Sequence, residues 1–110
     1  MKSYNKLVRD KIPEIIKTNG QAANLRKLDE DEYFKALNQK LTEEIAEYFE
    51  DYNTEELADV IEVVYAIVKC KGLSLEDFEI IRKRKLDERG GFEDRLMLVE
   101  VERREVKCMI

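Results

Sequence analysis

Apolar residues recur every three or four positions along the middle of the chain, which is the period of an amphipathic helix. The stripe comprises Tyr33, Leu37, Leu41, Ile45 and Tyr48. It predicts a helix from about residue 31 to residue 50. Asp29 or Asp31 is available to cap the first turn of this helix, because a side-chain carboxylate there can accept a free backbone N–H.

A second segment, residues 57–68, is almost continuously apolar and is interrupted only by Asp59 and Glu62. A helix that is apolar around its whole circumference is expected to be buried. Asn53 or Thr54 can cap its start, and Gly72 marks its end. Because only residues 51–53 separate the two predicted helices, we expect these helices to form an antiparallel hairpin.

Shorter elements flank this hairpin. Pro13 suits the first turn of a short helix that Gly20 ends. Ser74 resembles the N-cap of a fourth helix, residues 75–88, which precedes a pair of glycines. Residues 96–101 are strand-like and are followed by a charged segment, residues 103–107. The pattern predicts an all-α helical bundle with a short C-terminal strand or an extended arm.

Acidic residues lie on both halves of the predicted hairpin. Glu44 and Glu47 are three residues apart, as are Glu56 and Asp59, so each pair shares a helix face. In an antiparallel hairpin the four carboxylates can converge. Acidic residues on helices are usually solvated, but buried ones must be compensated by basic residues or by a divalent cation. Carboxylate oxygens without histidine suit Mg²⁺ or Mn²⁺.

Composition narrows the functional classes. The 110 residues favour one domain, residues 1–110, and a net charge of −5 without a long basic run argues against binding a nucleic-acid polymer. Two cysteines without metal or redox spacing are typical of the reducing cytoplasm, and we expect neither a signal peptide nor a membrane span. The absence of histidine excludes Ser–His and Cys–His nucleophile systems and the usual zinc sites.

The acidic pattern resembles that of a known enzyme family. Glu43-Glu44-Ile45-Ala46-Glu47, followed by Glu56-Leu57-Ala58-Asp59, is similar to the EExxE…ExxD signature of the all-α nucleotide pyrophosphohydrolases, which include the MazG-like enzymes, dimeric dUTPases and phosphoribosyl-ATP pyrophosphohydrolases. The opening residues 4–13 and the Arg89-Gly90-Gly91-Phe92 turn look like a small MazG-like subgroup, often labelled phosphoribosyl-ATP pyrophosphohydrolase-like.

The resemblance implies hydrolysis of a nucleoside triphosphate, or a related nucleotide, between its α and β phosphates, with a monophosphate and pyrophosphate as products. It implies that Glu44, Glu47, Glu56 and Asp59 hold Mg²⁺, and that the candidate catalytic residues are Glu43, Glu44 and Glu47. Glu43 is then a candidate to orient or deprotonate water, a role that Glu62 could share. A phosphoribosyl-ATP substrate and a house-cleaning role on non-standard nucleotides both fit.

Basic residues would bind the outer phosphates, because the chain has no glycine-rich phosphate loop. The candidates are Lys6, Arg9, Lys11, Arg82, Lys83 and Lys85. The apolar perimeter of the second long helix predicts a homodimer, or a dimer of dimers, that buries it. The competing hypothesis is a non-enzymatic helical module whose acidic hairpin binds a basic partner. A calcium sensor is excluded because no EF-hand loop spacing is present.

Overall fold

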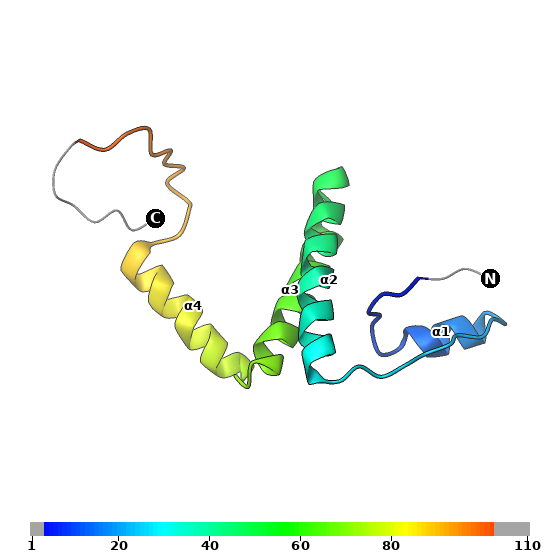
Figure 1. Cartoon of the computed structure of the whole chain (residues 1–110). Helices are drawn as coiled ribbons and strands as arrows, with labels where there is room; N and C mark the ends of the chain where they lie inside the picture. Colours follow the sequence, from blue (N-terminus) through cyan, green and yellow to red (C-terminus); the bar gives the residue numbers. More distant parts are fainter. Residues whose placement is uncertain (1–3, 103–110) are drawn as a thin grey trace.

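The computed structural model describes residues 4–102 and contains four helices and no strand within that range. They are α1 (Ile12–Thr18), α2 (Glu30–Asp51), α3 (Thr54–Cys70) and α4 (Leu75–Arg89), shown in Figure 1. This confirms the all-α fold that the periodicity predicted. None of the described helices is both long enough and apolar enough to cross a membrane.

The hairpin of α2 and α3 is fixed by local capping. Asp29 accepts the backbone N–H of Glu32, and the Glu32 side chain accepts the N–H of Asp29, so a complete capping box starts α2. Tyr52 ends α2 in the left-handed conformation, with φ 56°, and Asn53 caps α3 through the N–H of Glu55. A two-residue connection between the helices therefore reverses the chain.

The packed core lies between α2 and α3 and is small. Leu37 and Val68 are its buried apolar residues in the described chain. At the far end of α3, the ring of Tyr65 meets Phe78 of α4 edge to face, with centroids 6.5 Å apart. Beyond that contact α4 diverges from the hairpin, so α4 covers only the end of α3 (Figure 1).

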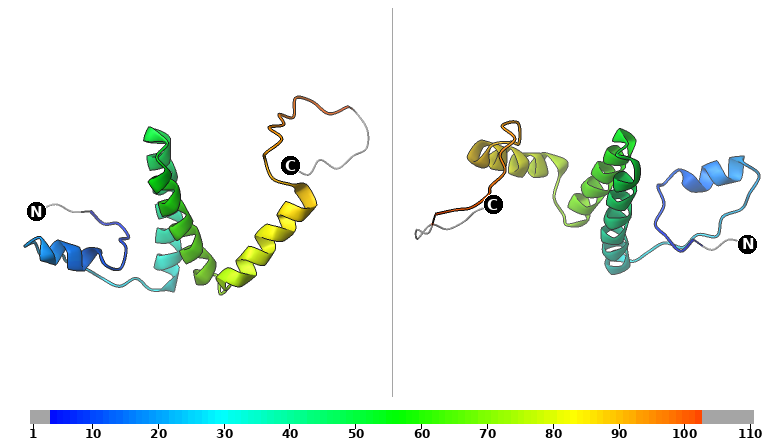
Figure 2. Two further views of the ribbon diagram at one scale, coloured as in Figure 1. Left: turned by 180° about the vertical axis from the view of Figure 1, so that it is seen from behind. Right: turned by 90° about the horizontal axis from the view of Figure 1, so that it is seen from above.

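The helices spread outward from the hairpin. In both views of Figure 2, α1 and α4 lie on opposite sides of it. The radius of gyration is 19.3 Å and the extents are 64 × 33 × 22 Å, whereas a compact chain of this size has a radius of gyration of about 13 Å. The single chain therefore leaves much of its apolar surface uncovered.

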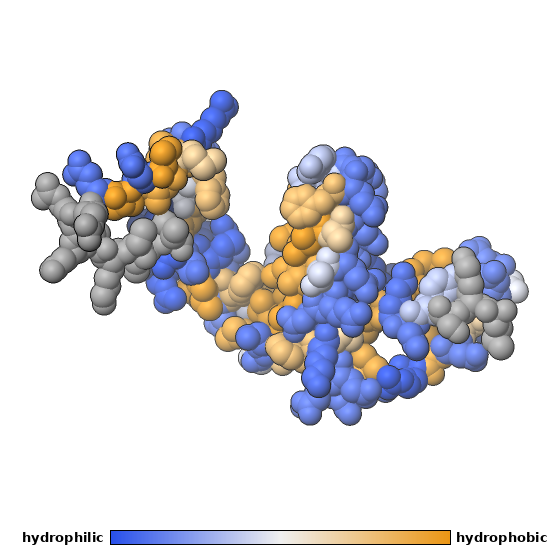
Figure 3. All heavy atoms as spheres, turned by 45° about the horizontal axis from the view of Figure 1, so that its top comes forward, coloured by the Kyte–Doolittle hydropathy of each residue, from blue (hydrophilic) through white to orange (hydrophobic). Residues whose placement is uncertain are grey.

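The expected burial of α3 is met only in part. Val68 is its one buried residue, and Leu57 and Ile61 are exposed. Apolar side chains form a continuous surface on one side of the central hairpin (Figure 3). The sequence predicted this apolar perimeter correctly, but within the described chain no other helix lies close enough to cover it.

The segment that follows α4 forms no strand in its described part. Residues 96–102 lack regular secondary structure, and they continue an arm in which Phe92 is 96% exposed. A strand needs a neighbouring strand to receive its hydrogen bonds, and the described chain offers none. Of the two forms expected for this segment, a short strand or an extended arm, its described part therefore adopts the arm. The charged residues 103–107 lie outside the described range.

The uncovered apolar surface leads to a first prediction. We expect a homodimer, or a dimer of dimers, in which a second copy covers the exposed face of the hairpin, because exposing this surface to water is unfavourable. Light scattering at micromolar concentration should give at least twice the chain mass of 13.0 kDa. A stable monomer of that mass would contradict the expectation.

Candidate metal centre

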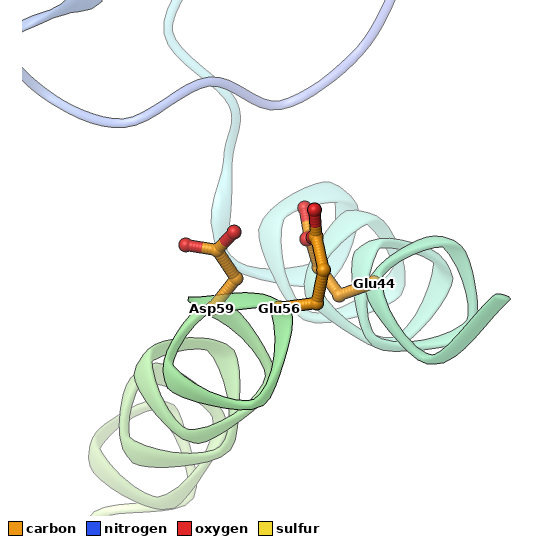
Figure 4. Close-up of side chains that lie close together, drawn as sticks. All are labelled: Glu44, Glu56 and Asp59. Carbon is orange, nitrogen blue, oxygen red and sulfur yellow. The ribbon is translucent and has the colours of Figure 1, made fainter. Parts of the chain in front are cut away.

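Three carboxylates converge on one face of the hairpin of α2 and α3. Glu44 comes from α2, and Glu56 and Asp59 lie three residues apart on the first turns of α3 (Figure 4). Ligand atoms from these three residues all lie within 4.8 Å of one another. Residues three apart on a helix share a face, so the hairpin turn brings the acidic face of α3 to Glu44.

The carboxylates are partly removed from water. Glu44 is only 7% exposed, and its Oε2 atom has no hydrogen-bond partner. Oε2 of Glu56 is likewise buried and without a partner. Buried polar atoms in proteins are nearly always paired, and leaving a charged one unpaired is costly. Two buried carboxylate oxygens without partners, on residues whose ligand atoms converge, therefore fit a cation as their missing partner.

The crowding shifts the protonation of both glutamates. Burial raises the pKa of Glu44, the neighbouring charge of Glu47 raises it further, and Lys40 opposes the shift. Burial also raises the pKa of Glu56, with added repulsion from Glu47 and Asp59. Both groups thus bind protons more readily than free carboxylates, because nearby negative charge and desolvation disfavour their ionised forms.

The other acidic candidates lie at the edge of this cluster. Glu47 is exposed and is not among the three residues whose ligand atoms converge, although its charge acts on both Glu44 and Glu56. Glu43 is half-buried, with its carboxylate 3.7 Å from Lys40 Nζ. Glu62 is exposed. The buried carboxylate is Glu44 on α2, whereas the apolar run had pointed to Asp59 and Glu62 on α3.

Among the six predicted phosphate-binding residues, Arg9 reaches the carboxylates. Its Nη2 atom donates to Asp59 Oδ1 at 2.6 Å. Lys6 lies 5.8 Å over the ring of Tyr4, and Lys11 is exposed at the start of α1. The three candidates on α4 are exposed: Arg82, Lys83 and Lys85. Arg82 is paired with Glu79 of the same helix. Because α4 leads away from the hairpin, it does not bring these three side chains to the carboxylates (Figure 1).

One basic residue at the cluster was missed from the sequence. Lys40 Nζ lies 3.5 Å from Glu44 Oε1, and the Lys40 side chain is only 19% exposed. A signal was present, since Lys40 and Glu44 are four residues apart on one helix and such pairs are neighbours. Lys40 balances one oxygen of Glu44 and leaves the other without a partner.

The donor set fits Mg²⁺ or Mn²⁺. All three converging side chains offer oxygen, which these hard cations prefer. Mg²⁺ usually keeps several water molecules and takes only one or two carboxylates plus substrate phosphates, so it does not need a complete shell of protein ligands. Glu44, Glu56 and Asp59 would hold the ion, with Glu47 close by.

Comparison with known proteins gives little further information. No protein-family model matches the chain, and no solved structure matches it significantly. A segment of 41 residues is 54% identical to an uncharacterized protein of Mycolicibacterium smegmatis (strain ATCC 700084 / mc(2)155). The match covers 37% of this chain and 42% of that relative, so the chain matches less than half the length of the relative.

Metal binding should stabilise the fold. A cation that binds only the folded protein adds about 2.7 kcal/mol at a hundredfold excess over its Kd, which raises Tm by on the order of 10 °C for a chain of this size. We expect Mg²⁺ to raise Tm, and Asp59→Asn to remove most of that shift. Differential scanning calorimetry with and without Mg²⁺ measures both. Equal shifts in the wild type and in Asp59→Asn would exclude Asp59 as a ligand.

Without metal, stability should fall as pH rises. A carboxyl group with a raised folded pKa contributes stability below its ordinary pKa of 4.5 and loses it as pH rises through the folded value. Glu44→Gln cannot ionise, so its Tm should drop less than the wild-type Tm between mildly acidic and neutral pH. Glu79, whose pKa is lowered by Arg82, acts in the opposite direction but is common to both proteins. An identical pH profile for both would contradict the expectation.

Proposed function

We propose that this protein is a Mg²⁺-dependent nucleotide pyrophosphohydrolase that acts in the cytoplasm. The observation that carries the proposal is the convergence of Glu44, Glu56 and Asp59, with two buried carboxylate oxygens left without partners. The resemblance of residues 43–59 to the EExxE…ExxD signature supports the same reaction. The substrate class is a nucleoside triphosphate or a related nucleotide, with phosphoribosyl-ATP included.

Charge explains why such a site needs a cation. A polyphosphate chain and a cluster of carboxylates repel each other, so the acidic residues cannot bind the substrate directly. Bound between them, Mg²⁺ would neutralise phosphate charge and lower the pKa of a coordinated water. Glu44, Glu56 and Asp59 would hold that ion, because the hairpin already brings their carboxylates together.

The reaction requires one proton transfer. The oxygen of a water molecule attacks the α-phosphorus, the bond from that phosphorus to the α–β bridging oxygen breaks, and pyrophosphate leaves with the bonding electrons. The water gives one proton to a base. Glu47 is better placed than Glu43 for this task, because Glu47 is exposed beside the cluster whereas Glu43 lies against Lys40. Of the two roles expected for Glu47, metal ligand and catalytic residue, we therefore propose the catalytic one.

A matched pair of variants tests the site. Glu56→Gln keeps the shape of the side chain but removes one charged ligand, so we expect turnover to fall at least a hundredfold, about 2.7 kcal/mol in barrier height. Glu55→Gln is the control, because Glu55 lies on the same turn of α3 and is exposed. Circular dichroism should show that both variants remain helical.

Product analysis tests the bond that is cleaved. The protein is incubated with Mg²⁺ and a panel of canonical and modified nucleoside triphosphates and phosphoribosyl-ATP, and the products are separated by chromatography. Monophosphate plus pyrophosphate supports the proposal. Diphosphate plus orthophosphate would place the attack at the γ-phosphorus and contradict it. No turnover of any nucleotide would favour the alternative, an acidic helical module that binds a basic partner.

A further inference from the structure

The N-terminal segment, residues 4–11, passes the open side of the three carboxylates (Figure 4). Its contact with the cluster is the ion pair from Arg9 to Asp59, which joins residues 50 positions apart in the sequence. The Arg9 carbonyl accepts the N–H of Ile12 at 3.0 Å, so the start of α1 anchors the backbone at this point. Further along, residues 5–7 line a small pocket with residues of α2, namely Ala36, Gln39, Lys40 and Glu43.

The two cations at the cluster differ in their surroundings. The Lys40 side chain is 19% exposed and lies between Glu43 and Glu44 of its own helix. The Arg9 side chain is 57% exposed, and its partner Asp59 is 39% exposed. An exposed ion pair shifts an equilibrium by about fivefold at most. Lys40 is therefore a fixed counter-ion, whereas Arg9 is held weakly and can exchange its partner.

Asp59 is also one of the three residues that would hold the metal. A divalent cation there would place a second positive centre beside the guanidinium on the same carboxylate, and the two cations repel. Once released, a guanidinium is well suited to phosphate, to which it donates two parallel hydrogen bonds. Because Arg9 is exposed and lies beside the carboxylates, a nucleotide that approaches the bound cation would meet its side chain.

We propose that Arg9 exchanges partners during binding: it pairs with Asp59 in the cation-free protein and with a phosphate of the nucleotide once a divalent cation occupies the carboxylates. The inference rests on the proposed function and adds residues 4–11 to the substrate site. Arg9 thus weakens cation binding in the absence of nucleotide and strengthens nucleotide binding in the presence of cation. These two effects have opposite signs.

Calorimetric titration of Arg9→Ala measures both effects. Without nucleotide, Mn²⁺ should bind the variant more tightly than the wild type, by roughly 1.5- to 5-fold, because the competing ion pair is gone. With saturating Mn²⁺, a triphosphate analogue with a methylene group between the α and β phosphorus atoms should bind about tenfold more weakly or worse, because a charged hydrogen-bond donor is lost. A purely structural role for Arg9 would weaken both.

Two further variants serve as controls. Arg26→Ala also removes an arginine from an exposed ion pair, the 3.0 Å contact with Glu32, and should change neither affinity. Arg9→Lys keeps the charge without the planar fork, so analogue binding should fall by less than in Arg9→Ala. If the wild type binds Mn²⁺ but Arg9→Ala fails to show the two opposite changes, the exchange is wrong and the metal site stands. If the wild type binds no Mn²⁺, the proposed function itself fails.

Discussion

The main physical constraint on this structure is the negative charge that two packed helices hold close together. The tight connection at Tyr52 and Asn53 fixes the register of α2 against α3, and that register sets Glu44 opposite Glu56 and Asp59. Packing buries Glu44, while Lys40 balances only one of its oxygens. The remaining charge is unfavourable unless another cation contributes, and the ion pair between Arg9 and Asp59 provides part of that balance.

This charge sits on the best-packed part of the chain. The hairpin contains both buried apolar residues of the described part of the chain, Leu37 and Val68, whereas α1 and α4 extend away from it (Figures 1 and 2). Sites on rigid helices hold their ligands more precisely than sites on loops, so the hairpin is a suitable scaffold for a metal. The segment before α1 adds a second positive charge at the carboxylate cluster, the exposed guanidinium of Arg9.

Features set by local sequence could be predicted well. The four helices, the cap at Ser74 and the shared face of Glu56 and Asp59 follow from helical periodicity and capping chemistry. Features set by tertiary geometry could not be predicted from the sequence. The burial of Glu44 could not be predicted because it depends on the register of two helices. Of the six basic candidates, Arg9 forms an ion pair with the carboxylate cluster, and this too could not be predicted because the paths of α1 and α4 have no local sequence signature. Lys40 was within reach of prediction, at helical spacing from Glu44.

The central claim is that Glu44, Glu56 and Asp59 together bind one divalent cation. Anomalous diffraction from crystals grown with Mn²⁺ tests it most directly, because the signal locates the metal without reference to activity. The account predicts one strong peak among the three carboxylates, at about 2.0–2.2 Å from their oxygens. A fully occupied site elsewhere on the protein, or three well-ordered carboxylates that hold no metal at saturating Mn²⁺, would contradict it.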